Sequence, residues 1–89
     1  MKKRNKLEII KDILDILRKN GPIKPTPLLR KSNLSSSRFS EYYPELISKN
    51  FINETINKNN EKFISISSKG DNFLEKYKTI VQFIEEFEL

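Results

Sequence analysis

The 89-residue sequence contains no cysteine and no histidine. Without thiols and imidazoles the chain lacks the commonest nucleophiles, general bases and zinc ligands of proteins, so no metal site or other cofactor is expected. Two pairs of carboxylates, Asp12 with Asp15 and Glu85 with Glu86, are better explained as solvated or ion-paired side chains than as catalytic groups. The sequence therefore predicts a protein that is not an enzyme.

Long apolar runs are also missing. No stretch of about 18 apolar residues could cross a membrane, and the basic start of the chain leads into an amphipathic segment rather than an apolar signal core. We therefore expect a cytoplasmic, nucleoid-associated protein with no membrane partner and no evident small-molecule ligand.

Positive charge is concentrated in the first half of the chain. The net charge is +5; residues 1–45 carry 11 basic and 5 acidic side chains, whereas residues 46–89 carry 6 and 7. An excess of lysine and arginine suits a polyanion, because cations near phosphates release condensed counterions on binding. A solvated basic surface without any partner explains the charge equally well, so charge alone does not decide for a nucleic acid.

The first regular apolar pattern lies in residues 6–20. It predicts a helix buried along a broad face by Leu7, Ile9, Ile10, Ile13, Leu14, Ile16 and Leu17. Gly21 and Pro22 end this helix, because glycine permits a left-handed cap and proline cannot continue the hydrogen-bond ladder. The residues before the helix are expected to fray as a disordered tail, or to reach a phosphate as a basic arm of Lys2, Lys3 and Arg4.

Residues 25–52 predict two helices joined by a tight turn. Thr26 can cap the first helix, and Asn33 can take the left-handed conformation that ends it. Ser35 can cap the second helix, which is expected to run to about residue 49. Two helices that cross steeply after a short turn form a helix-turn-helix, whose second helix can enter the major groove of DNA.

Pro44 interrupts the pattern of this second helix. An interior proline removes one backbone hydrogen bond, clashes with the preceding turn and costs about 3 kcal/mol. The helix is therefore expected to bend between Ser40 and Pro44 or to restart there.

A β-hairpin is predicted next. Residues 51–56 and 62–66 alternate apolar and polar side chains, and the asparagine-rich stretch between them supplies a turn. A short edge strand fits at residues 23–24, because a residue before proline is pushed toward extended backbone. A hairpin after a helix-turn-helix has the position of the wing in a winged helix, with a polar tip at residues 57–61.

The last predicted helix begins near Ser68, which has capping-box spacing with Asp71, and reaches nearly to Leu89. Its apolar side chains recur by alternate steps of four and three, as in a coiled coil, so a homodimer is expected. The seam and its flank consist of Phe73, Leu74, Tyr77, Ile80, Val81, Ile84 and Phe87. The alternative is that this stripe packs on the first helix of the same chain.

The exposed start of the second helix is where a helix-turn-helix meets base edges. Arginine can pair with guanine or clamp a phosphate, and serine bonds almost any base, so a weak sequence preference is expected. The end of the preceding helix is better placed for phosphates, and the hairpin tip for a neighbouring groove. The candidate contacts are Arg30, Lys31, Ser35, Ser36, Ser37, Arg38, Ser40, Lys58, Asn59 and Lys62, with Glu41 on the same face.

Four motifs in fixed order carry a family resemblance. They are KLEIIKDIL (6–14), GxIKPTxL (21–28), SNLS (32–35) and SxKGxxFL (67–74). Together they make the chain similar to the archaeal winged helix-turn-helix proteins of about ten kilodaltons, the chromatin-type DNA binders of the Sulfolobales. The resemblance implies an elongated homodimer on double-stranded DNA, paired through an antiparallel coiled coil. By position, its recognition helix falls on residues 35–49 and its wing on residues 57–61.

The expected fold class is mainly α with a small β-hairpin (α+β). A winged helix-turn-helix DNA-binding domain at residues 1–67 is followed by a dimerisation helix at residues 68–89 that forms a dimer coiled coil. The leading hypothesis is a dimeric double-stranded DNA-binding protein, either a transcription regulator or a chromatin-like architectural protein. A protein-protein interaction module on the same scaffold is the alternative, because fold alone does not settle function.

Overall fold

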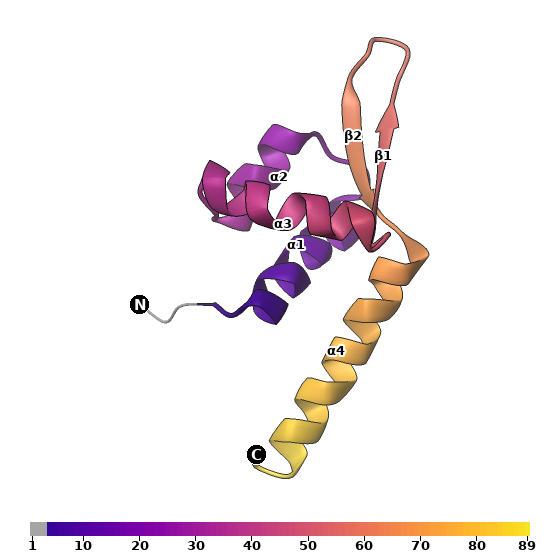
Figure 1. Cartoon of the computed structure of the whole chain (residues 1–89). Coiled ribbons are helices and arrows are strands. Elements are labelled where there is room, and N and C mark those ends of the chain that lie inside the picture. The colour runs from indigo at the N-terminus through magenta and orange to yellow at the C-terminus, as the bar shows by residue number, and fades with distance from the viewer. Residues whose placement is uncertain (1–3) are drawn as a thin grey trace.

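The structure, a computed structural model, describes residues 4–89, which form four helices and one two-stranded sheet. The elements are α1 (Lys6–Asn20), α2 (Pro25–Ser32), α3 (Ser36–Ser48), β1 (Ile52–Ile56), β2 (Lys62–Ile66) and α4 (Ser68–Glu86). Helices α1 to α3 form one body, the hairpin projects from it, and α4 leaves it in a different direction (Figure 1). The molecule extends 51 × 29 × 22 Å. The predicted mainly helical α+β class is confirmed.

One apolar core joins the helices to the hairpin. Its most deeply buried side chains come from α1, α2, α3 and β2: Ile13, Leu14, Leu17, Leu28, Leu46 and Ile64. Each such burial contributes about 1.5–3 kcal/mol relative to exposure. The broad buried face predicted for α1 is confirmed except at Leu7, which is 55% exposed because it lies at the edge of that face in the first turn.

The start of α1 is held by local and long-range bonds. The Asn5 side chain accepts from the Glu8 backbone at 2.8 Å, and the Glu8 carboxylate accepts from the Asn5 backbone at 3.3 Å. Arg4 donates to the Asp12 carboxylate at 2.8 Å and to the Ser32 carbonyl at 3.0 Å. Asn5 is therefore not frayed, and Arg4 is tied to α1 and α2 rather than extended as an arm. The other arm residues, 2 and 3, lie outside the described part of the chain.

Helices α2 and α3 form the predicted helix-turn-helix. The left-handed Asn33, with φ 60° and ψ 26°, ends α2, and Ser35 caps α3 by accepting from the Arg38 backbone at 3.2 Å. The predicted Thr26 cap is wrong. Helix α2 begins at Pro25 after Lys24, because proline has its φ preset for the first helical position and no N–H to satisfy there.

Helix α3 runs without interruption through Pro44, so the predicted restart there does not occur. Pro44 lies on the exposed face, where water can bond the carbonyl that loses its partner. The next turn is held by Leu46, which is completely buried in the core. Packing of the far side thus outweighs the local cost of proline.

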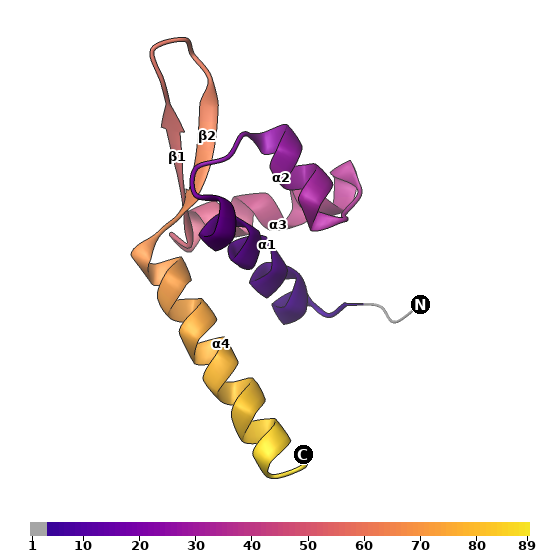
Figure 2. The same ribbon diagram turned by 180° about the vertical axis from the view of Figure 1, so that it is seen from behind.

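The hairpin has the predicted strands and the predicted asparagine turn. The Asn57 side chain accepts from the backbone of Asn59 at 2.9 Å and of Glu61 at 3.0 Å. The edge strand expected at residues 23–24 is a single bridge, in which Ile23 and Ile64 exchange backbone bonds of 3.0 and 2.8 Å. The far end of the hairpin stands clear of the helices in both views (Figures 1 and 2).

Helix α4 begins at a different cap from the one predicted. Ser67, not Ser68, accepts from the Gly70 backbone at 3.0 Å. Asp71 does not complete a capping box, because it accepts from Arg18 of α1 at 2.7 Å. Arg18 also reaches Glu75 at 3.1 Å, so the first two turns of α4 are bound to α1.

The apolar stripe of α4 has two halves with different surroundings. In the first half Leu74 is buried, and Phe73 packs on the core with its ring centroid 5.2 Å from that of Phe51. In the second half α4 extends beyond the body (Figure 2). Four large side chains there are between 41% and 58% exposed: Ile80, Phe83, Ile84 and Phe87. Packing within the chain therefore accounts only for the first half of the stripe.

Candidate nucleic-acid interface

Helix α3 presents a face of small side chains to solvent. Ser36, Ser37 and Ser40 are exposed, as predicted. On its other side Leu46 is buried, and the rings of Phe39 and Tyr43 stack with centroids 5.6 Å apart against the core. Since small side chains let the backbone of a helix approach closely, this face suits insertion into a groove.

Arg38 lies at the flank of this face. Its guanidinium sits over the ring of Tyr42 at 5.9 Å, and one terminal nitrogen donates to the Tyr42 hydroxyl at 3.3 Å. Its Nε lies 3.9 Å from the Glu41 carboxylate and has no hydrogen-bond partner among residues 4–89. This Nε is buried, so another molecule can reach Arg38 only through the exposed part of its side chain, which is 38% exposed as a whole.

A three-residue network joins α3 to the hairpin. The Tyr43 hydroxyl donates to the Glu54 carboxylate, which also pairs with Lys62 at 3.2 Å. The bond from Tyr43, followed by the pairing with Lys62, lowers the pKa of Glu54. Burial and the same bond raise the pKa of Tyr43, so its hydroxyl stays protonated. Lys62 and Ser40 also line one hollow of about 290 Å³, which brings two predicted contacts together.

The hairpin tip is anchored at its base. Lys24 pairs with Glu61 and lies 5.9 Å over the ring of Phe63, and this pairing lowers the pKa of Glu61. Beyond that anchor, Lys58 and Asn59 are exposed. The two residues are thus free to contact another molecule.

The two predicted contacts on α2 lie in different surroundings. Arg30 is exposed in the last turn of α2. Lys31 lines a second hollow of about 290 Å³ together with Asp12 and Asp15 of α1. The structure therefore does not place Lys31 in the hollow shared by Ser40 and Lys62.

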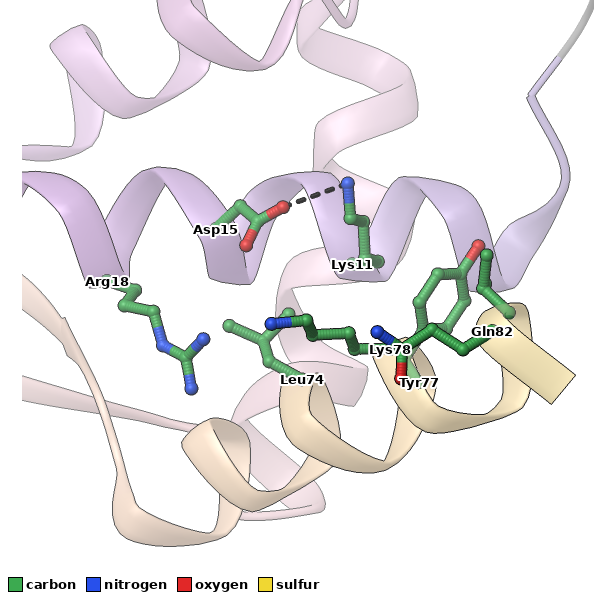
Figure 3. Close-up of a pocket in the computed structure, with 8 residues that line it drawn as sticks. Lys11, Asp15, Arg18, Leu74, Tyr77, Lys78 and Gln82 are labelled. Carbon is green, nitrogen blue, oxygen red and sulfur yellow. Dashed lines mark ion pairs between the residues drawn. The ribbon is translucent and has the colours of Figure 1, made fainter. Parts of the chain in front are cut away.

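A further hollow of about 430 Å³ lies where α4 diverges from α1 (Figure 3). Lys11 and Arg18 line it from α1, and Leu74 and Tyr77 from α4. Lys11 is already paired with Asp15 at 2.9 Å, which raises the lysine pKa. Residues 4–89 hold no group of three carboxylates that could bind a metal ion, in this hollow or elsewhere.

The profile of the winged helix-turn-helix family matches residues 3–85, nearly the whole chain. The chain belongs to the winged helix-turn-helix family. In the terms of this family, α3 is the recognition helix and the hairpin is the wing. No curated protein matches the chain in sequence. Within the described residues, no helix combines the length and apolarity that a membrane span requires.

Several solved structures share this winged helix-turn-helix fold. Sso10a-2, a DNA-binding protein from Sulfolobus solfataricus, matches with a TM-score of 0.73 and 20% identity, over 96% of this chain and 86% of its own. YusO from Bacillus subtilis matches with a TM-score of 0.78 and 22% identity, over 91% of this chain and 59% of its own. A Bacillus cereus protein assigned as a MarR-like transcription regulator matches with a TM-score of 0.71 and 15% identity, over 85% and 57%.

These identities establish a common fold, and the chain spans less than two thirds of either Bacillus protein. The match to Sso10a-2, a protein of similar size, confirms the resemblance to the small Sulfolobales proteins. The sequence reading missed the Tyr43–Glu54–Lys62 network, because its members are far apart in the chain. It also missed Phe83 on α4, which lies outside the heptad seam but is exposed beside Phe87.

Proposed function

We propose that the protein binds double-stranded DNA as a homodimer and acts in the nucleoid as a transcription regulator or an architectural protein. The recognition helix, residues 35–49, enters the major groove, and the wing, residues 57–61, lies on adjacent backbone or minor groove. The observation that carries this proposal is the exposed small-residue face of α3 beside a wing fixed by Tyr43, Glu54 and Lys62.

Free cations at two of the predicted contacts support a polyanionic partner. Arg4, Lys11 and Arg18 are paired with carboxylates of α1 and α4, and Arg38 and Lys62 with Glu41 and Glu54. Arg30 and Lys58 have no ion-pair partner among residues 4–89. Cations of this kind gain most from phosphates, because they have no internal pair to break.

DNA binding is expected to be salt-dependent in a residue-specific way. Fluorescence anisotropy with a duplex of about 31 base pairs, three turns, should show micromolar or tighter binding that weakens steeply with salt. The double variant Arg30→Gln/Lys58→Gln removes two unpaired cations and should reduce the salt slope by about two per protomer.

The matched control for this experiment is Lys11→Gln/Lys69→Gln, which removes the same charge from α1 and from the start of α4. Its salt slope should equal that of the unaltered protein. Absence of binding at low salt would instead favour a protein-protein interaction module on the winged-helix scaffold.

The exposed half of α4 supports the homodimer. The rings of Phe83 and Phe87 lie 4.8 Å apart on the surface, next to the exposed Ile80 and Ile84. Covering them with the same surface of a second copy removes apolar area from water at about 25 cal/mol per Å². In this proposal residues 68–89 form the dimerisation segment, although the first half of α4 also belongs to the core of its own chain.

The charge order along α4 favours an antiparallel pair. Lys76 and Lys78 precede the exposed half, whereas Glu85, Glu86 and Glu88 follow it. Glutamates at a helix C-terminus are unfavourable with the helix dipole, so they need cations nearby. An antiparallel partner brings its lysines to these glutamates, and a parallel partner brings more glutamates.

Cysteine cross-linking is expected to report this orientation, and the chain has no native cysteine to interfere. We would compare Ile80→Cys, Ile84→Cys and Phe87→Cys under mild oxidation. In an antiparallel pair only the position nearest the two-fold axis meets its own copy within disulfide distance, about 4.4–6.8 Å between Cα atoms. One variant of the three should therefore form a covalent dimer. Efficient cross-linking of all three would show a parallel pair.

A further inference from the structure

The outer face of α3 carries an acidic group at a place where DNA-binding proteins gain from cations. The Glu41 side chain is 68% exposed. Its exposed neighbours Ser37, Ser40 and Pro44 are uncharged. A carboxylate brought among phosphates is repelled by them, and the repulsion is offset only where the carboxylate accepts a hydrogen bond from a base.

The major groove offers two such donors, the N4 amino group of cytosine and the N6 amino group of adenine. A G·C pair presents the guanine acceptors N7 and O6 followed by the cytosine donor. An A·T pair instead ends in the thymine O4 acceptor and the methyl group. An arginine that needs two adjacent acceptors, with a carboxylate beside it, therefore fits G·C, whereas in A·T the adenine amino donor takes the place of the second acceptor.

Arg38 and Glu41 form such a group. They lie one helical turn apart, with the guanidinium Nε 3.9 Å from the carboxylate. The Nε is buried and has no hydrogen-bond partner in the described chain, and one terminal nitrogen donates to the Tyr42 hydroxyl at 3.3 Å. The side chains of Arg38 and Glu41 are 38% and 68% exposed, so a cation and a carboxylate are held side by side at the edge of the groove-facing surface.

We propose that Arg38 and Glu41 together read one G·C base pair in each half-site, Arg38 on guanine N7 and O6 and Glu41 on the cytosine amino group. The proposal rests on the DNA-binding function proposed above. This contact gives α3 a preference for one base pair in each half-site, whereas the serines of α3 tolerate almost any base. Glu41 is thus a specificity residue that lowers affinity for DNA in general.

The first test is selection from random duplexes with the unaltered protein and with Glu41→Gln. The unaltered protein should enrich one G·C pair per half-site, and exchanging that pair for A·T should weaken its binding at least about fivefold. Glu41→Gln removes the charge but keeps the shape. It should bind the A·T duplex more tightly than the unaltered protein and discriminate between the two duplexes less strongly, because only the Arg38 contact with guanine remains.

A base analogue separates the roles of the two side chains. Replacing the selected guanine by 7-deazaguanine removes N7 without changing base pairing. It should weaken binding by the unaltered protein and by Glu41→Gln, but not by Arg38→Gln. The control Glu75→Gln removes an equal charge from the first half of α4, where Arg18 keeps its pairing with Asp71, and should leave the G·C preference intact.

Two negative results have different meanings. Salt-sensitive binding without an enriched G·C pair, or with a G·C preference that Glu41→Gln leaves undiminished, overturns the assignment of Arg38 and Glu41 and leaves DNA binding in place. Failure of both proteins to bind any duplex at low salt overturns the proposed function itself. Circular dichroism of each variant identifies any loss of helix.

Discussion

Replacing Ile84 by glutamate is expected to convert the protein to a monomer and to weaken its binding to DNA about 100-fold. Ile84 lies in the middle of the exposed half of α4 and is 41% exposed. In a pair of α4 helices a charge at this position is buried beside its own copy or beside Phe83 and Phe87, without a partner. Two recognition helices on one duplex bind with a high effective concentration, which separate monomers lose.

Light scattering coupled to size exclusion would measure the mass, and anisotropy with the three-turn duplex the affinity. The matched control is Gln82→Glu, which adds the same charge to the face of α4 that lies away from the stripe. Glutamate is a good helix former, so circular dichroism should show α4 intact in both variants. A dimeric Ile84→Glu protein, or an unaltered protein that is monomeric at tens of micromolar, would contradict this interface.

Local features of this fold were readable from the sequence. Asn33 ends α2 and Ser35 caps α3 because each acts on a backbone group within three residues. The same holds for the asparagine turn of the wing. Where two serines are adjacent, as at the start of α4, the sequence pattern does not show which of them caps the helix. Ser67 rather than Ser68 caps α4, because the Ser67 hydroxyl also donates to the Asn50 carbonyl at 2.6 Å, a contact across 17 residues.

The candidate site was less predictable than the fold, because its properties depend on long-range contacts. A heptad seam has the same spacing whether the same chain or a second chain covers it. The structure was therefore needed to show that the apolar side chains of α4 are covered as far as Tyr77 and are mostly exposed after it. Arg38 was predicted as a DNA contact, but its position over Tyr42 and beside Glu41 depends on side-chain packing. The sequence alone identifies the basic residues. The role proposed for Glu41 depends on its contact with Arg38, which only the structure shows.

Gly70→Ala is expected to destabilise the fold by about 2 kcal/mol, although alanine is usually the better residue in a helix. The helix around Gly70 is pressed against the start of the hairpin. A Cβ there would lie well inside van der Waals contact of the Phe51 carbonyl oxygen and 2.9 Å from Cγ1 of Ile66. That carbonyl cannot yield freely, because it accepts from the Ser67 backbone at 3.0 Å. Overpacking against a backbone atom costs about 3 kcal/mol, the upper end of the usual range, and so exceeds the helix-propensity gain of about 1 kcal/mol.

Urea unfolding followed by circular dichroism, at one fixed protein concentration because the proposed dimer would contribute to stability, would measure this loss. Asn72→Ala is the control, since Asn72 is exposed in the same part of α4 and its change should be neutral or slightly stabilising. A Gly70→Ala protein as stable as this control would mean that α4 can tilt away from the hairpin at little cost. Such a tilt would move the dimer surface relative to the recognition helix. The close contact at Gly70 therefore links the stability of the fold to the spacing of the two DNA-binding surfaces in the proposed dimer.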